Sequence, residues 1–353
     1  MAEARWRLLL DVDTGIDDAV ALLYLLALPG VSLEAITCTA GNVGARQVAI
    51  NNLALLELCG HAGIEVAIGS DVPLEVPLVT TEETHGDQGL GYAELPPPRG
   101  RISGRHAVDV WLEAVRCHPG QITGVVTGPL TNLALALRAE PELPMLLRGL
   151  VIMGGAFHHP GNTTPVAEWN IHVDPHAAKE VFAAYEGMPA DRLPIICALE
   201  TTERIECTPA HVDAFARAAG AGPEMLAPED PPGTRSRSDN AVVACVSDAL
   251  RFYMEFHRQY DQGYIAHLHD LFAAQVAAGQ ARIATRATVV DVEADSELLR
   301  GTTVHDTRDI WGRRPNAQLV TANDPAQVFA AFARAVGAVV AGERTLDGGS
   351  PAR

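Results

Sequence analysis

Apolar and polar positions follow two rhythms along this chain. Short apolar runs such as 8–13 predict buried strands, and longer amphipathic runs such as 17–28 predict helices. Because such alternation produces right-handed βαβ units, we expect an α/β fold in a single domain, with a mostly parallel open sheet flanked by helices. Further strands are predicted at 33–39, 66–69, 122–126, 150–153, 195–199, 288–292 and 318–321, and further helices at 45–59, 106–117, 209–219, 240–260 and 325–340, with others ending at Arg138 and Tyr185 and one opening at His269.

Two long irregular stretches interrupt this rhythm. Residues 71–105 are rich in Pro, Glu and Gly, and residues 220–238 also lack periodicity, so both are predicted to be mobile loops. The polar stretch 157–173 is predicted to be a loop. The tail from residue 342 is predicted to be frayed.

Polar residues follow several of the predicted strands at the point where each strand ends. Asp13, Asn42, Thr127 and Gly154 each come directly after an apolar run. The carboxyl ends of parallel strands meet at one edge of an open sheet, where ligands bind. The sequence therefore predicts that these residues gather in one crevice, although the order of the strands is not readable.

Four carboxylates, those of Asp11, Asp13, Asp17 and Asp18, crowd the first of these strand ends. Carboxylates this close raise one another's pKa, and no Lys or Arg occurs between residues 8 and 45 to offset them. A divalent cation is the economical explanation, and ligation by oxygen alone indicates Ca²⁺ or Mg²⁺ rather than zinc. Asp17 alone would also suit a helix N-cap, but capping does not account for four acids.

Other interpretations of the acidic cluster fit less well. An EF-hand loop needs a Gly at its sixth position and a preceding helix, whereas a strand precedes here. The stretch 11–14 also resembles haloacid-dehalogenase phosphatases, which need a downstream Lys, and Lys179 is expected on a helix surface. A dinucleotide site would need a Gly-rich turn, and acids there would repel a pyrophosphate.

Composition excludes several classes of partner. The 353 residues are 48% hydrophobic, which suffices for a large core, and the net charge is −18. Such an acidic chain would repel nucleic acid and anionic membranes. Six scattered cysteines without a Cys-x-x-Cys motif indicate a reducing, cytoplasmic environment. Asp11 and Asp13 interrupt the early apolar run, so we expect neither a signal peptide nor a membrane span.

Several motifs in this order resemble the nucleoside hydrolases, the inosine-uridine-preferring nucleoside N-ribohydrolases. The resemblance covers nearly the whole chain, and Glu200 departs from it, standing where the family often has Asp. The matching segments are Asp11-Val12-Asp13-Thr14-Gly15-Ile16-Asp17-Asp18-Ala19, Gly41-Asn42-Val43, His85-Gly86 with Gly89-Leu90, Thr127-Gly128-Pro129-Leu130-Thr131-Asn132, Met153-Gly154-Gly155, Gly161-Asn162, Ala167-Glu168 with Asn170, Asp174-Pro175, Leu268-His269-Asp270 and Leu299-Arg300-Gly301.

The resemblance implies a Rossmann-like fold, a bound Ca²⁺, a homodimer or homotetramer, and hydrolysis of ribonucleosides to ribose and free base. It implies calcium ligation by Asp13, Asp18, the backbone carbonyl of Thr127 and Asp270. Asp13 also resembles the base that deprotonates the calcium-bound water. The residues that resemble substrate-binding groups, chiefly for the ribose hydroxyls, are Asp17, Asn42, Met153, Asn162, Glu168, Asn170 and Asp270.

At the base end, the resemblance implies two histidines. His269 matches the residue proposed to protonate the leaving base, which favours inosine and pyrimidine nucleosides, and His85 matches one that faces the base. His257, Tyr260 and Tyr264 could line the same pocket or belong to the core. His158 and His159 are expected to be solvated loop residues, and Asp11 is expected to support the geometry of the loop. The purine-specific members stack the base on tryptophans, and the matched motifs do not place Trp111 or Trp169 for that role.

The chemistry of these residue types agrees with glycoside hydrolysis. Carboxylates stabilise an oxocarbenium-like transition state, and a histidine can be the proton donor for a leaving base near neutral pH. Three alternatives remain: a metal-dependent phosphatase, a non-catalytic nucleoside-binding protein, and a hydrolase of modified nucleosides. Since Asp13 and His269 are both present, nothing in the motifs indicates loss of turnover.

Overall fold

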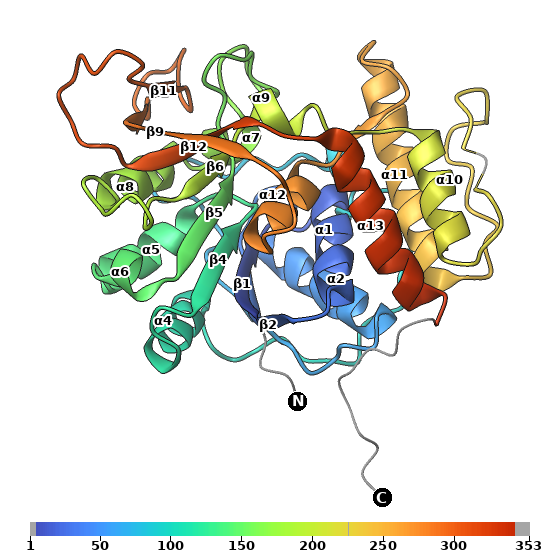
Figure 1. Cartoon of the computed structure of the whole chain (residues 1–353). Coiled ribbons are helices and arrows are strands. Elements are labelled where there is room, and N and C mark those ends of the chain that lie inside the picture. The colour runs from blue at the N-terminus through green and yellow to red at the C-terminus, as the bar shows by residue number, and fades with distance from the viewer. Residues whose placement is uncertain (1–4, 225, 343–353) are drawn as a thin grey trace, which may run out of the picture.

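A computed structural model describes residues 5–224 and 226–342 of the chain. The tail that we predicted to be frayed falls almost entirely on residues 343–353, outside the described residues. Figure 1 shows a central sheet with helices on both faces. The fold class predicted from the sequence is thus confirmed.

The central sheet has eight strands, in the order β3-β2-β1-β4-β5-β6-β12-β9. All neighbours pair in parallel except the edge strand β9, which is antiparallel to β12. The bounds are β1 (Trp6–Val12), β2 (Val31–Cys38), β3 (Glu65–Ile68), β4 (Ile122–Val126), β5 (Gly149–Met153), β6 (Ile195–Cys197), β9 (Ala284–Thr288) and β12 (Ala317–Ala322).

Helices cover the two faces of the sheet as separate layers (Figure 1). On one side lie α4 (Ala107–Cys117), α5 (Thr131–Ala139), α6 (Leu143–Leu146) and α8 (Pro175–Ala184). On the other side lie α1 (Ile16–Ala27), α2 (Ala45–Leu58), α12 (His269–Ala277) and α13 (Pro325–Val340), and beyond these α10 (Pro209–Ala218) and α11 (Ala241–Gln259).

Each face of the sheet has its own apolar core. Along β1, Leu8 and Leu10 pack into the core beside α1, whereas Leu9 packs into the core beside α4 and α5. Successive side chains of a strand point to opposite faces, so a strand covered on both sides is apolar at every position. This explains why the strands could be recognised from uninterrupted apolar runs.

Short helices and strands occur where the sequence predicted loops or one continuous strand. The loop predicted at 157–173 ends in α7 (Trp169–Val173), and the insertion 71–105 contains α3 (Glu82–His85). The predicted strand 195–199 stops at Cys197, where α9 (Leu199–Thr202) follows. The side chain of Glu168 caps α7, and all three helices are too short to leave a periodic pattern in the sequence.

The strand predicted at 288–292 was wrong as a single element. The chain leaves β9 at Thr288 and forms β10 (Val290–Val292), which pairs with β11 (Thr303–His305) in a separate sheet. Val290 donates its N–H to the buried side chain of Asn316 instead of extending β9. An apolar run cannot show where a strand changes its partner. A further small pair joins β7 (Glu206–Cys207) to β8 (Ala266–His267).

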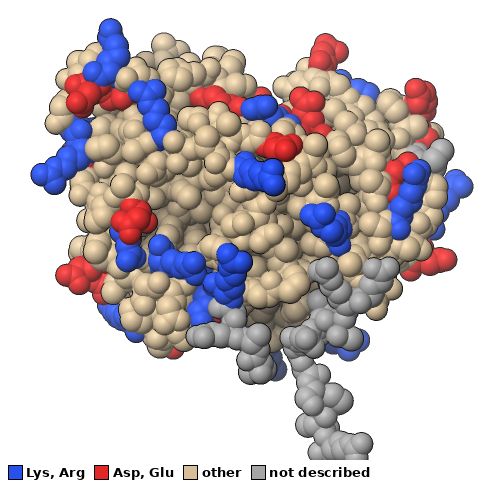
Figure 2. All heavy atoms as spheres, in the orientation of Figure 1, with Lys and Arg blue, Asp and Glu red and all other residues tan. Residues whose placement is uncertain are grey.

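The face shown in Figure 2 carries charges of both signs, and acidic and basic side chains are interspersed over it. Within residues 5–224 and 226–342, no helix has both the length and the apolar character to cross a bilayer. The cysteines are all unpaired, and Cys38, Cys197, Cys207 and Cys245 are buried.

Candidate active site

The polar strand ends predicted from the sequence meet at the centre of the sheet. The strands β2, β1, β4 and β5 are direct neighbours, so Asn42, Asp13, Thr127 and Gly154 follow four adjacent strand ends. The N-terminus of α12 lies at the same edge, because α12 packs against α1, β4 and β5. The predicted crevice is therefore a real feature of the fold.

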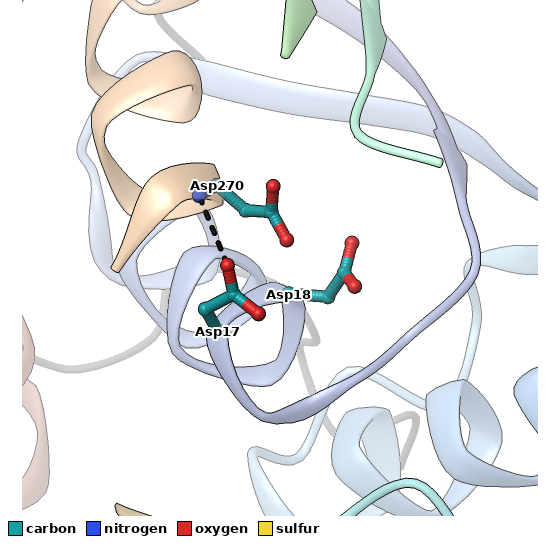
Figure 3. Close-up of side chains that lie close together, drawn as sticks. All are labelled: Asp17, Asp18 and Asp270. Atoms are coloured by element: carbon teal, nitrogen blue, oxygen red, sulfur yellow. Dashed lines mark hydrogen bonds between the residues drawn. The ribbon is translucent and has the colours of Figure 1, made fainter. Parts of the chain in front are cut away.

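Three carboxylates converge there from two helices (Figure 3). Asp17 and Asp18 lie in the first turn of α1, and Asp270 lies in the first turn of α12. One oxygen from each lies within 4.8 Å of the others, and all three residues are buried. The backbone N–H of Asp270 donates to Oδ2 of Asp17 at 3.4 Å.

Asp18 has two local roles in addition to its place in the cluster. Its Oδ2 accepts a hydrogen bond from the backbone N–H of Gly15 at 2.8 Å, which caps α1. Its Oδ1 accepts from the hydroxyl of Thr127 at 2.6 Å. The N-cap of α1 is thus Gly15, not Asp17, and the carboxylate of Asp17 is left for the cluster.

Asp13 lies beside this cluster with one oxygen unsatisfied. Its Oδ2 accepts from the backbone N–H of Asn42 at 2.8 Å, while its buried Oδ1 accepts no hydrogen bond from any described residue. Backbone crowds the side chain on two sides. A Cβ on Gly41 would lie 2.1 Å from Oδ2, and one on Gly128 would lie 2.9 Å from the Asp13 nitrogen.

Burial and mutual repulsion raise the pKa of these carboxyl groups. Burial first, and then the charge of Asp18, raise the pKa of Asp17 to about 7. Burial raises the pKa of Asp18 to about 6. The pKa values of Asp13 and Asp270 lie well above the ordinary value, again chiefly because of burial. A group of buried acids that offers only oxygen atoms as metal ligands, one of them without a hydrogen bond, fits a hard divalent cation.

Glu168 and Asn170, on the first turn of α7, form the opposite side of the site. Glu168 caps the helix, because its oxygens accept from the backbone N–H groups of Asn170, Ile171 and Gly155. The Asn170 amide donates to the backbone carbonyl of Thr127 at 2.7 Å. Asn162 accepts from the backbone N–H of Trp169 at 3.0 Å. The unpredicted helix α7 thus aligns the predicted polar groups.

A cavity of about 850 Å³ opens above these groups. Asp13 and Asp18 lie behind its wall, each almost fully buried. Ten of the twelve residues that the sequence singled out line the cavity: Asp17, Asn42, His85, Thr127, Met153, Asn162, Glu168, Asn170, His269 and Asp270.

The predicted histidines are buried and neutral. Nδ1 of His269 lies 2.9 Å from the hydroxyl of Thr202, and burial holds its pKa well below the usual range. Nδ1 of His85 accepts from the backbone N–H of Ile16 at 3.1 Å, and burial lowers its pKa to about 3. A Cβ on Gly15 would lie 2.6 Å from His85, so glycine permits this contact.

Several cavity residues were missed or misplaced by sequence reasoning. His159, which we predicted to be a solvated loop residue, lines the cavity, and its Nε2 lies 3.5 Å from Glu203. Trp169 also lines the cavity. His267 and Tyr253 also line it, although neither was singled out, and the spacing of His267 to His269 was the available signal. Of the open aromatic positions, His257 and Tyr260 line the cavity and Tyr264 does not, while Trp111 is core.

Two further carboxylates support the site: Asp11, which is fully buried behind the cavity, and Glu200, which lines it. The carboxylate of Asp11 accepts hydrogen bonds from the Thr37 hydroxyl and the Asn132 side-chain NH₂ group. The side-chain oxygen of Asn132 in turn accepts from the backbone N–H of Ser70, so these contacts link neighbouring strand ends. Glu200 accepts from the backbone N–H groups of Phe157 and His158, holding the loop that leads toward α7. Both act on backbone geometry.

Comparisons with known proteins point to one family. The sequence model described as inosine-uridine preferring nucleoside hydrolase matches residues 8–330. The chain is 34% identical over 314 residues to a pyrimidine-specific ribonucleoside hydrolase, RihA, of Enterobacter sp. (strain 638), covering 89% of this chain and 92% of that protein.

Solved structures agree in fold. A plant nucleoside hydrolase, PpNRh1, superposes with a TM-score of 0.80 at 27% identity, covering 94% of this chain and 99% of that chain. A purine-preferring ribonucleoside hydrolase from Gardnerella vaginalis gives a TM-score of 0.81 at 26% identity, covering 95% and 99%. Since these similarities span nearly the whole chain, they apply to the site as well as to the sheet.

Proposed function

This chain belongs to the inosine-uridine preferring nucleoside hydrolase family and is an N-glycosyl hydrolase of ribonucleosides, and on that premise we propose that it depends on Ca²⁺ and prefers pyrimidine nucleosides and inosine. The observation that carries the proposal is the convergence of Asp17, Asp18 and Asp270 at the floor of the cavity. The phosphatase alternative is not favoured, because the family match covers its supposed motif.

The residues that would hold Ca²⁺ are Asp13, Asp18, Asp270 and the backbone carbonyl of Thr127, with Asp17 beside them. When bound, Ca²⁺ would neutralise the carboxylates and lower the pKa of water at the site. Two observations support this assignment. Oδ1 of Asp13 is unsatisfied, and among the described residues no Lys or Arg side chain pairs with the three clustered acids.

Asp13 suits the role of general base. The backbone N–H of Asn42 holds one carboxylate oxygen, so the other is presented in a fixed orientation to take a proton from the attacking water.

Ribose binding fits the polar groups on the opposite side of the cavity. Glu168 and Asn170 are held by α7, and Asn42 and Asn162 supply further amide groups. Hydroxyl groups of ribose can donate to the carboxylates and accept from the amides. Negative charge near the sugar also stabilises the oxocarbenium-like transition state.

His269 suits the role of proton donor to the leaving base. Burial disfavours the charged ring, so resting His269 carries one N–H, and full proton transfer to the base requires the ring to take up a second proton first. When the Thr202 hydroxyl donates to Nδ1, the proton resides on Nε2, which is then available to the base. The relatives differ in the base of their substrates, since one is named pyrimidine-specific and another purine-preferring. The preference for pyrimidine nucleosides and inosine that we propose for this chain therefore depends on His269.

Two further expectations belong to the proposal. The unpaired cysteines agree with a reducing cytoplasm, and the family resemblance suggests a homodimer or homotetramer. A non-catalytic binding protein would bind nucleosides without releasing ribose.

A reducing-sugar assay with uridine, cytidine, inosine, adenosine and guanosine, with and without EGTA, tests the proposal. We expect ribose release that is greatest with uridine, cytidine or inosine, is lost in EGTA and returns with added Ca²⁺. Tight nucleoside binding without ribose release would overturn the enzyme assignment. Full activity after exhaustive chelation would overturn the metal assignment.

A further inference from the structure

A row of aromatic rings lines one wall of the cavity. Ring centroids are 5.3 Å apart from His85 to Tyr253, 4.5 Å from Tyr253 to His257, 4.9 Å from His257 to His267, and 5.6 Å from His267 to His269. The row is assembled from α3, α11, the end of β8 and the start of α12. All five rings contact the same cavity as Asp17 and Asp270.

The histidines of this row are uncharged at neutral pH. Burial lowers the pKa of His257 to about 4 and that of His267 to about 4, in each case with a smaller contribution from a neighbouring histidine. His85 and His269 are lowered for the same main reason. Each ring therefore has one nitrogen that donates and one that accepts a hydrogen bond.

The structure determines which nitrogen of His257 accepts. Nδ1 lies 2.9 Å from the backbone carbonyl of Tyr253, one turn earlier in α11. A carbonyl can only accept, so Nδ1 carries the proton and Nε2 carries the lone pair. Nδ1 faces its own helix, which leaves Nε2 on the outer side of the ring.

Nε2 of His257 has no partner within residues 5–224 and 226–342, although the residue is only 4% exposed. His85 has the opposite polarity, because its Nδ1 accepts from Ile16 and its Nε2 therefore donates. The wall thus offers an acceptor and a donor where an uncharged heteroaromatic ring would bind.

We infer that Nε2 of His257 recognises the base by accepting a hydrogen bond from an N–H group at its edge. Uracil offers such a group at N3, cytosine at its amino group and hypoxanthine at N1, and adenine and guanine also carry N–H groups away from the glycosidic bond. The inference rests on the proposed function and adds the residue that distinguishes a base with this donor from an analogue that lacks it. A site whose buried acceptor loses its partner rejects the analogue that lacks the donor.

The test compares three substrates: uridine, 3-methyluridine, which lacks the N3–H, and p-nitrophenyl riboside, which has no N–H on its leaving group. The variants are His257→Leu, which removes the acceptor, and His257→Gln, which restores an acceptor oxygen. His118→Leu is the matched control, because His118 lies at the end of α4 and does not line the cavity.

We expect His257→Leu to lower kcat/KM for uridine about 10- to 100-fold while p-nitrophenyl riboside stays close to the wild-type value. His257→Gln should recover most of the uridine activity. The wild type should discriminate against 3-methyluridine, and His257→Leu should lose most of that discrimination. His118→Leu should behave as wild type with all three substrates.

Equal losses on uridine and p-nitrophenyl riboside in His257→Leu would overturn the inference, since the ring would then serve packing alone. Unchanged discrimination against 3-methyluridine in that variant would also overturn it. In both cases ribose release by the wild type would leave the proposed function standing. A wild-type protein that releases no ribose from any nucleoside would overturn the proposed function, and this inference with it.

Discussion

Asp270 donates its backbone N–H to the carboxylate of Asp17 at 3.4 Å, although the two residues lie 253 positions apart in the chain. The contact joins the first turns of α1 and α12, and it brings their carboxylates together with that of Asp18 (Figure 3). Helix N-termini carry partial positive charge, which offsets part of the repulsion among the three acids. The remaining repulsion is what a bound cation would relieve.

Replacing the proposed base should remove both turnover and part of the metal affinity. We expect Asp13→Ala to lower kcat about 10²- to 10⁴-fold, the range for loss of an acid–base group, and to weaken Ca²⁺ binding measured by titration calorimetry. Asp109→Ala, on the surface of α4, is the control and should change neither. Wild-type turnover in Asp13→Ala would contradict the assigned role.

The backbone that surrounds Asp13 should tolerate no added carbon. A Cβ on Gly41 would lie 2.1 Å from Oδ2 of Asp13, so Gly41→Ala should displace that carboxylate and reduce both Ca²⁺ affinity and turnover. Gly44→Ala is the matched control, because nothing lies within 4 Å of the added carbon. Similar behaviour of the two variants in calorimetry and in the ribose assay would show that the crowding has no functional consequence.

Thr202 should act on the leaving base only through His269. The variant Thr202→Val removes the hydroxyl that lies 2.9 Å from Nδ1 and keeps the side-chain volume. We expect kcat for inosine and uridine to fall about 10-fold or more, while p-nitrophenyl riboside, whose leaving group needs no proton, is little affected. His269→Ala should show the same contrast in stronger form. If Thr202→Val slows all substrates equally, the hydroxyl serves packing and not the tautomer of His269.

In the calcium-free protein, the contribution of Asp17 to stability should fall as pH rises through the acidic range. The pKa of Asp17 is about 7 in the folded protein and near 3.8 when unfolded, so the folded state binds the proton more tightly. The contribution of Asp17 therefore becomes less favourable as pH rises from about 4 to about 7, by a few kcal/mol in all. Buried neutral histidines such as His257 act in the opposite direction, because their folded pKa values are lowered.

A comparison with Asp17→Asn in EGTA separates the two effects. Urea denaturation at several pH values should show the wild type losing stability relative to the variant between about pH 4 and 7, and Ca²⁺ should reverse the loss. A difference between the two proteins that does not change with pH would contradict the raised pKa of Asp17.

The sequence by itself determined the architecture and most of the polar side of the site. Strands buried on both faces are apolar at every position, and the residues that follow them must meet at one edge of a parallel sheet. That is why the apolar runs alone suffice to gather Asp13, Asn42 and Thr127 into one crevice. The sequence did not show the order of the strands, which makes these residues neighbours, or the break between β9 and β10 after Thr288. Apolar runs do not specify which strand each one pairs with.

Only the tertiary structure decided the wall where the base would bind. Tyr253, His257 and His267 come from elements whose packing brings their rings together. Tyr253 and His257 have no local pattern that sets them apart from core or surface residues, and His267 has only its spacing to His269. The local periodicity of a sequence shows which face of a helix or strand is buried. Which rings share a cavity, and which nitrogen of each ring carries the proton, depends on contacts between elements that are distant in sequence.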